Sequence, residues 1–232
     1  MCVLEVQIYC PHCYSSDVVK NGKKVTGQQN FKCKSCGKQF LHEYLYWGAD
    51  PRNKRLMSRM LVRGSGVSDI AQVLGVSQVC VLQHLWRLSS QVSQKAGKQE
   101  YDKLQLDELW SFVGKKKRKR WFLYAYCPES KEIVAMVCGS RNAATVRKLY
   151  QKLKNLQVNW YCTDKWKAFA KVLPYDRHLV GKKFTKAIEG VNTALRLRNR
   201  RMNRKTTCFS KSENNHLHAM KLSVNYFNHH TF

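Results

Sequence analysis

Two adjacent carboxylates, Asp107 and Glu108, interrupt an otherwise apolar stretch, Leu104–Gly114, which reads LQLDELWSFVG. Such a run is typical of a central β-strand covered on both faces. Because side chains alternate along a strand, Asp107 falls on the more polar face and Glu108 on the apolar face. A carboxylate without a partner is costly inside a core. We therefore predict Asp107 as a ligand in a metal-dependent nuclease or transferase site and Glu108 as an edge or salt-bridge group. Ordinary strand-end charges are the alternative.

Asp164 follows a second strand-like run, Val158–Thr163. The carboxyl ends of strands are where α/β sheets place their ligands, so we predict Asp164 as a second acid of the same site. Lys165 and Lys167 lie beside it, which leaves a surface ion pair as the alternative.

Glu189 is the only acid among nine Lys and Arg residues between Gly181 and Lys205. A helix here places Glu189, Asn192 and Arg196 on one face, beside an apolar stripe. We predict that Glu189 offers an oxygen to a metal while Asn192 and Arg196 hold DNA. A simple helix salt bridge is the alternative for Glu189, and Glu213 is a weaker candidate for a third acid. The stripe consists of Ile188, Val191, Leu195 and Met202.

Two C-x2-C pairs, Cys10/Cys13 and Cys33/Cys36, stand near the start of the chain with 19 residues between them. This spacing matches a structural zinc ribbon, in which four thiolates surround one ion. Gly37 follows the second pair, where a tight turn is expected. Four plain thiols, or another soft metal, are the alternatives.

The chain has 232 residues, with 42 Lys and Arg against 15 Asp and Glu, a net charge of +27. So large an excess favours a polyanionic partner, most commonly nucleic acid. The hydrophobic content of 44% excludes a disordered basic tail. No apolar run approaches the roughly 18 residues that span a bilayer. With no recognisable signal peptide, the ten cysteines indicate a reducing compartment.

Between the cysteine pairs and the acids, the segment from Gly66 to Leu88 predicts two short helices. Ser68 is expected to cap the first, Gly75 to make the turn, and Ser77 to cap the second. This pattern favours a helix-turn-helix, whose second helix enters the major groove. A helical hairpin that packs against something else is the alternative. The residues predicted to touch DNA are Gln78, Gln83, His84 and Arg87.

A run of six cations, from Lys115 to Arg120, lies between two strand-like runs, so we predict a hairpin loop that contacts phosphates through Lys116, Lys117 and Arg118. The following pattern gives three antiparallel strands, a helix, a parallel strand that ends in Asp164, and further helices. This order is that of the ribonuclease-H-like fold. The predicted elements are strands at 121–127, 132–138 and 158–163 and helices at 142–156 and 166–173.

The predicted fold class is multidomain α+β. We place a zinc ribbon at residues 1–48, a helix-turn-helix at 49–90, a linker at 91–103 and an α/β catalytic domain of the ribonuclease-H-like type at 104–232.

Taken together, these motifs resemble the insertion-sequence-one family of bacterial DDE transposases. The resemblance rests on 106–114 (LDELWSFVG), on Thr163-Asp164 with Trp166 and Lys167, and on Ile188-Glu189 with Asn192 and Arg196, followed by 205–212 (KTTCFSKS). It covers nearly the whole chain, and 24 residues separate Asp164 from Glu189, a spacing similar to that of the family.

The resemblance implies that Asp107, Asp164 and Glu189 are catalytic and bind two Mg²⁺ ions. It also implies binding to terminal inverted repeats and target DNA, 3′-end cleavage with strand transfer, and an assembly of two or more chains that holds two ends together. A cytoplasmic, nucleoid-associated bacterial protein without a membrane partner is expected. A DNA-binding regulator with a degenerate nuclease domain and a hydrolytic nuclease without strand transfer are the competing functions.

Overall fold

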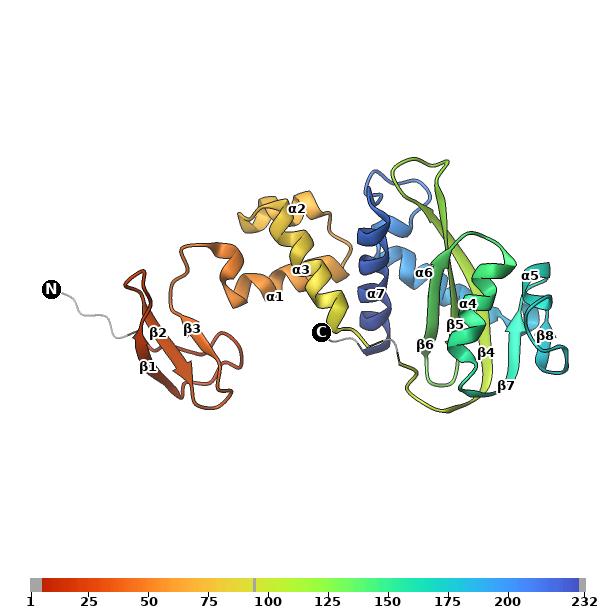
Figure 1. Ribbon diagram of the computed structural model, residues 1–232, viewed down its shortest axis with the longest axis horizontal. Coiled ribbons are helices and arrows are strands. Elements are labelled where there is room, and N and C mark those ends of the chain that lie inside the picture. The colour runs from red at the N-terminus through yellow and green to blue at the C-terminus, as the bar shows by residue number, and fades with distance from the viewer. Residues whose placement is uncertain (1–5, 94, 230–232) are drawn as a thin grey trace.

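Three bodies follow one another along the long axis of the computed structural model (Figure 1). A small sheet leads to a helical bundle, and the bundle leads to a larger sheet covered by helices. The structure describes residues 6–93 and 95–229. Among these residues, no helix has both the length and the apolar character needed to cross a membrane.

The first body is a three-stranded antiparallel sheet of β1 (Val18–Lys23), β2 (Gln29–Cys33) and β3 (Gln39–Leu41). Its core is minute: the rings of Phe31 and Phe40 stack with centroids 5.8 Å apart. A sheet this small cannot bury enough apolar surface to be stable alone, so it depends on a cross-link such as a metal.

The helical bundle consists of α1 (Pro51–Val62), α2 (Val67–Leu74) and α3 (Gln78–Gln91), preceded by a 3-10 turn, η1 (Trp47–Ala49). As predicted, Gly75 ends α2 in the left-handed conformation, with φ 61°, and Ser77 caps α3 by accepting from the Cys80 N–H at 3.1 Å. The predicted Ser68 cap is wrong. α2 begins earlier, with Gly66 as its N-cap, and Asp69 accepts from the Gly66 N–H at 3.3 Å.

The larger sheet has the strand order β6-β5-β4-β7-β8. β4, β5 and β6 pair antiparallel, β7 runs parallel to β4, and β8 runs parallel to β7. The predicted succession of three antiparallel strands, a helix and a parallel strand is therefore confirmed. The elements are β4 (Glu100–Phe112), β5 (Lys119–Cys127), β6 (Glu132–Gly139), α4 (Ala143–Leu153), β7 (Gln157–Thr163) and β8 (His178–Val180).

Three details of this body differ from the sequence prediction. β4 begins at Glu100, so the connection from α3 spans only the residues between Gln91 and Glu100 rather than 91–103. The helix predicted at 166–173 shortens to α5 (Lys167–Ala170), followed by a 3-10 turn, η2 (Tyr175–Arg177). β8 was not predicted, because three residues are too few for a periodic signal.

Helices cover both faces of the larger sheet. α4 packs on the face that carries Leu104 and Leu106. α6 (Lys186–Arg198) and α7 (Glu213–His229) pack on the opposite face, which carries Leu109 and Tyr124. The predicted alternation of side chains along β4 is thus confirmed. Two further 3-10 turns flank α6: η3 (Lys182–Phe184) and η4 (Arg200–Met202), the latter holding the buried Met202 that was expected within the helix.

α7 stands between the helical bundle and the larger sheet (Figure 1). Leu222 is buried among the side chains of the bundle, whereas Met220 and Val224 are buried against the sheet. Two side-chain hydrogen bonds add to the contact with α3: Trp86 Nε1 donates to Asn215 Oδ1 at 2.7 Å, and Ser89 Oγ lies 2.6 Å from His218 Nδ1. One helix therefore completes two cores.

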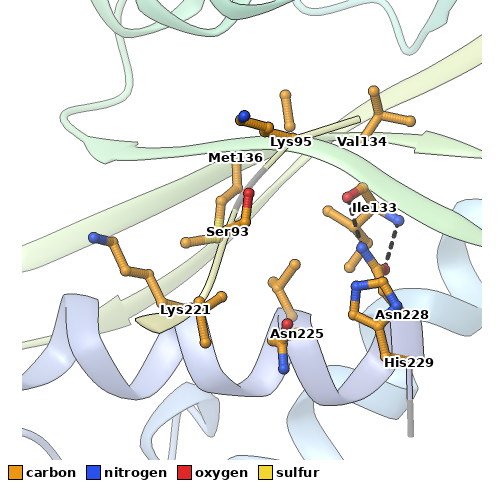
Figure 2. A pocket seen from close by; sticks show the side chains of 12 residues that line it. Ser93, Lys95, Ile133, Val134, Met136, Lys221, Asn225, Asn228 and His229 are labelled. Atoms are coloured by element: carbon orange, nitrogen blue, oxygen red, sulfur yellow. Dashed lines mark hydrogen bonds between the residues drawn. The ribbon is translucent and has the colours of Figure 1, made fainter. Parts of the chain in front are cut away.

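The last turns of α7 also protect the edge of the sheet. Asn228 accepts from the backbone N–H of Ile133 at 2.9 Å and donates to its carbonyl at 3.1 Å (Figure 2). Because Ile133 lies on β6, an edge strand, this amide takes the place of a neighbouring strand there.

Leu222→Ala tests the double role of α7. Leu222 is 2% exposed, so we expect truncation to lower the free energy of unfolding by about 2–5 kcal/mol. Hydrogen exchange should accelerate in α1–α3 more than in β4–β6, because the lost contacts face the bundle. The exposed Leu197→Ala serves as the control. Loss of protection confined to the sheet would show that Leu222 does not support the bundle.

Candidate active site and metal centre

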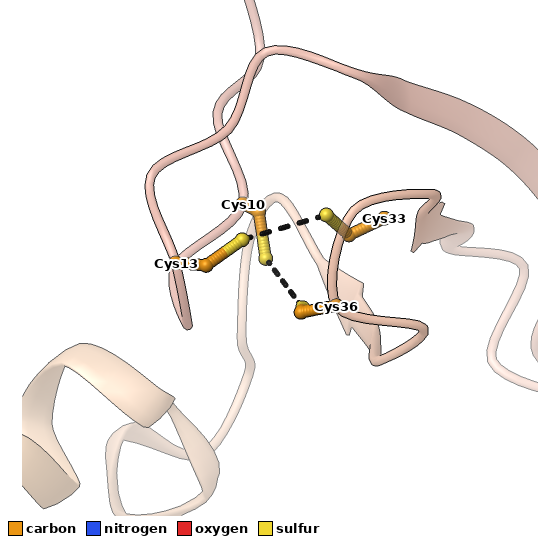
Figure 3. A group of neighbouring side chains, drawn as sticks. All are labelled: Cys10, Cys13, Cys33 and Cys36. Carbon is orange, nitrogen blue, oxygen red and sulfur yellow. Dashed lines mark hydrogen bonds between the residues drawn. The ribbon is translucent and has the colours of Figure 1, made fainter.

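Cys10, Cys13, Cys33 and Cys36 converge on one point, as Figure 3 shows. Their sulfurs lie within 4.8 Å of one another, with Cys10 and Cys36 at 3.7 Å and Cys13 and Cys33 at 3.6 Å. Zn–S bonds of about 2.3 Å in tetrahedral geometry separate the sulfurs by about 3.8 Å. The quartet thus fits a structural zinc ion, and Gly37, with φ 71°, makes the expected turn.

The parallel pairing of β4 with β7 positions two of the predicted acids. The ladder ends with Gln105 opposite Cys162. Continued by two residues, the same register sets Asp107 opposite Asp164, at the point where β7 ends. The charge of Asp164 also acts on the Asp107 carboxyl, so two acids that the sequence separates by more than fifty residues lie near each other where β7 ends.

Gln105 also brings in the third predicted acid. Its buried side-chain oxygen accepts from the backbone N–H of Ile188 at 2.8 Å. Glu189 is the next residue, in the first turn of α6, and its side chain is exposed. One buried amide thus fixes the start of α6 against the strand that carries Asp107. Sequence reasoning missed Gln105, although a polar side chain two residues before Asp107 in an apolar strand was a signal.

Both carboxylate oxygens of Asp107 accept hydrogen bonds. Oδ1 accepts from the Glu108 N–H at 2.8 Å, and Oδ2 accepts from Asn192 Nδ2 at 2.6 Å. Asn192 in turn accepts from the Tyr124 hydroxyl at 2.6 Å. Burial raises the pKa of Tyr124 well above its usual value, so the phenol keeps its proton and donates. Asn192 was expected to contact DNA, but its amide is engaged by Asp107 and Tyr124.

The acids influence one another electrostatically. The pKa of the Asp107 carboxyl is raised, mainly by burial. The hydrogen bonds from Asn192 and the Glu108 N–H oppose this rise, whereas the charges of Asp164 and Glu189 add to it. Asp164 is half-buried, and its Oδ1 accepts from the Trp166 N–H at 2.9 Å. Among the described residues only the cysteine quartet forms a closed set of ligand atoms. The three acids are neighbours, but they do not form such a set.

Glu108 is confirmed as a salt-bridge residue. Its Oε1 accepts from Arg141 Nη2 at 2.7 Å and from Nε at 3.0 Å. The Arg141 guanidinium also lies over the rings of Trp121 and Trp166, at 5.0 and 4.5 Å from their centroids. Burial raises the pKa of Glu108 to about 7, and Arg141 opposes this rise. Nothing in the sequence indicated Arg141 as the partner.

Arg196 stands two turns after Glu189 on α6, half-buried. Its Nε is buried without a hydrogen-bond partner among the described residues. Burial lowers the pKa of its guanidinium and Arg204 lowers it further, whereas Tyr124 and Asp107 oppose this shift. The arginine therefore contributes positive charge near Asp107, and its contact with DNA stays a prediction.

The predicted DNA-contacting residues of α3 divide into two groups. Gln78, Gln83 and Arg87 are exposed. His84 is 6% exposed, its Nε2 lies 2.8 Å from Ser58 Oγ, and burial lowers its pKa to about 4. The prediction for His84 is therefore wrong: the ring is a neutral core group that joins α3 to α1.

The first four residues of the basic run, Lys115–Arg118, lie in the loop of the β4–β5 hairpin, as predicted, whereas Lys119 and Arg120 begin β5. Lys116, Lys117 and Arg118 are exposed in the loop. Arg118 and Arg120 both form ion pairs with Glu213 at the start of α7. Glu213 is thus engaged by two arginines, which explains why it is the poorer candidate for a third acid.

Comparison with known proteins places these features in a family. The family model described as IS1 transposase matches residues 103–232, and the InsA N-terminal domain, a zinc ribbon, matches residues 4–37. The chain is 42% identical over 108 residues to the insertion element iso-IS1n protein InsB of Shigella dysenteriae, covering 47% of this chain and 82% of that protein. It is 38% identical over 112 residues to the insertion element IS1 2 protein InsB of Escherichia coli strain K12, covering 48% and 67%.

Among solved structures, the simian T-cell lymphotropic virus intasome in complex with PP2A regulatory subunit B56 gamma aligns with a TM-score of 0.41 and 12% identity. The alignment covers 77% of this chain and 69% of that chain.

Cys33→Ser tests the zinc centre. We expect the natural chain to bind about one zinc ion and the variant to bind none, because loss of one thiolate opens the tetrahedral set. Zinc released by a thiol-modifying reagent measures the stoichiometry, and hydrogen exchange should show loss of protection in β1–β3 with β4–β6 unchanged. Cys80→Ser, outside the quartet, is the matched control. Full zinc content in Cys33→Ser would contradict the assignment.

Proposed function

Because the chain belongs to the IS1 transposase family, we propose that it is the transposase of an insertion sequence. It binds the terminal inverted repeats of its own element, cleaves at the 3′ ends and transfers these ends to target DNA. Asp107, Asp164 and Glu189 carry the chemistry. The observation that supports this most directly is the register of β4 and β7, which sets Asp107 beside Asp164, with α6 held next to them through Gln105.

The fold supports the same proposal. A β6-β5-β4-β7-β8 sheet, with helices on both faces and an acid on its first strand, fits a ribonuclease-H-like catalytic domain. The tight turn at Gly75 between α2 and α3 fits a helix-turn-helix that presents Gln78, Gln83 and Arg87 to the major groove. We retain a zinc-ribbon domain, a helix-turn-helix domain and a catalytic domain as the division of the chain, with the linker shortened.

The three carboxylates fit Mg²⁺, a hard ion that prefers oxygen ligands. When bound, two such ions would supply positive charge at the attacking and the leaving oxygen of an in-line phosphoryl transfer. Asn192 and Tyr124 orient Asp107, so its carboxylate is positioned before DNA arrives. Arg196 offers positive charge to the phosphate nearby. Water is the first nucleophile, and the 3′-hydroxyl that it exposes is the second.

The DNA partner follows from the charge of +27 and from the exposed cations of the β4–β5 loop, Lys116, Lys117 and Arg118. Two element ends have to be held together during transfer, so we propose that two or more chains assemble on DNA.

A plasmid that carries the gene and its flanking DNA provides the decisive assay, with purified protein and Mg²⁺. We expect cleaved element ends and joined products, both abolished in Asp107→Asn, Asp164→Asn and Glu189→Gln while end binding persists. Asp176→Asn, which alters an exposed aspartate of η2, is the matched control and should stay active. End binding without chemistry in the natural chain would favour a regulator, and cleavage without joining would favour a nuclease.

Asn192→Ala tests the orienting role of that amide. Because Asn192 contacts Asp107, we expect the cleavage rate to fall about 10–100-fold, as for other groups that orient metal ligands. DNA affinity should stay constant. Leu197→Ala, on the exposed side of α6, is the control. If DNA affinity fell while the rate at saturating DNA was unchanged, the DNA contact expected from the sequence would be right after all.

A further inference from the structure

A cleft separates the helical bundle from the segment that follows α6, and none of the three acids lines it. One wall is the first turn of α2, Gly66–Asp69, together with Gln78, the first residue of α3. The other wall is formed by Arg201 and by the segment Thr207–Lys211. The helical bundle therefore contributes one side of the cleft. The other side comes from the catalytic body, the larger sheet with the helices and segments that cover it.

Arg201 is the unusual residue of this cleft. It is 8% exposed, and burial lowers the pKa of its guanidinium. No carboxylate among the described residues forms an ion pair with it. A buried cation without a counter-charge is costly, so an anion that enters the cleft gains a strong partner.

Two helix N-termini line the same cleft. Gly66, the N-cap of α2, has no side chain, and α2 has no side-chain cap hydrogen bond at its start. The first N–H groups of α2 thus remain available, and they carry the positive end of the helix dipole. Gln78 adds the start of α3, where the Cys80 N–H is already bonded to the Ser77 hydroxyl. The one carboxylate in the lining, Asp69, turns back to its own helix and accepts from the Gly66 N–H at 3.3 Å.

The opposite wall is anchored to the sheet. Ser210 forms a parallel bridge with Val113, and its carbonyl accepts from the Gly114 N–H at 2.8 Å. Its hydroxyl lies 3.1 Å from His216 Nδ1, and His216 Nε2 lies 2.9 Å from Ser111 Oγ. Lys211 follows, exposed at the mouth of the cleft. The wall is thus built before any ligand arrives.

We propose that this cleft binds a phosphate of the DNA backbone, so that one phosphodiester is held by the bundle and by the catalytic body together. The proposal rests on the DNA binding proposed above and adds a site to it. DNA is the favoured source of the phosphate because the first helix of a helix-turn-helix crosses the backbone while the second enters the groove, and the cleft lies at the start of both. Arg201 and Lys211 then extend the DNA contact of the bundle into the catalytic body.

Lys211→Ala and Ser68→Asp test the site without removing the buried arginine. Ser68 is exposed in the first turn of α2, where a carboxylate stabilises the helix but repels a phosphate. Lys154→Ala, an exposed lysine after α4, is the matched control. Fluorescence anisotropy measures the affinity for a duplex from the element end and for an unrelated duplex between low and moderate salt. Thermal melting confirms that each variant folds.

We expect the slope of log affinity against log salt to fall by about 0.9 for Lys211→Ala, because one phosphate contact is lost. The loss of affinity should be equal on both duplexes, since a phosphate contact carries no sequence information. Ser68→Asp should weaken both complexes while melting no lower than the natural chain, and Lys154→Ala should match the natural chain.

Two results would overturn this inference and leave the proposed function intact. In the first, the natural chain binds DNA and both variants show the same dependence of DNA affinity on salt as the natural chain. In the second, inorganic phosphate at matched ionic strength stabilises the natural chain against heat, and Lys211→Ala loses this stabilisation while its salt dependence of DNA affinity is unchanged; the cleft would then bind a free anion. A natural chain without salt-dependent DNA binding would instead overturn the proposed function itself. The outcomes are therefore distinguishable.

Discussion

The parallel pairing of β4 with β7 stops at Gln105 and Cys162, and the candidate site depends on where it stops. Beyond that point β4 continues to Phe112 with β5 on one side only, so the acids lie where two strands part. A slip of one residue would turn Asp107 towards α4 and Glu108 towards α6. Gln105 opposes such a slip, because its side chain is bonded to the backbone of α6.

The neighbouring carboxylates of β4 show how the two faces of a strand assign different roles. Glu108 forms an ion pair with Arg141, whose guanidinium lies over two tryptophan rings, so the charge of Glu108 is already balanced within the protein. Asp107 meets only neutral donors, Asn192 and its own chain, together with the repulsion of two other acids. Its charge therefore remains available to a cation, whereas that of Glu108 does not.

Much of this could be predicted from the sequence where the signal is local. The spacing of four cysteines predicted the metal centre, and alternation predicted the two faces of β4. The errors arose where a side chain meets a distant segment. His84 looks like a DNA-reading residue until α1 places Ser58 against it. The contacts of Asn192 with Asp107 and Tyr124 were likewise absent from the sequence signal, although its predicted DNA contact stays a prediction. Helical periodicity identifies a face but not its partner.

The shared helix α7 has a consequence for the order in which the protein is made. Leu222, which completes the core of the bundle, lies 131 residues after Gln91, the end of α3. At ribosomal rates of about 5–20 residues per second, roughly ten seconds pass between the emergence of α3 and that of its last wall. During that interval the helical bundle lacks one side of its core. The core of the bundle is therefore completed only when the larger sheet and most of its helices have already been synthesised.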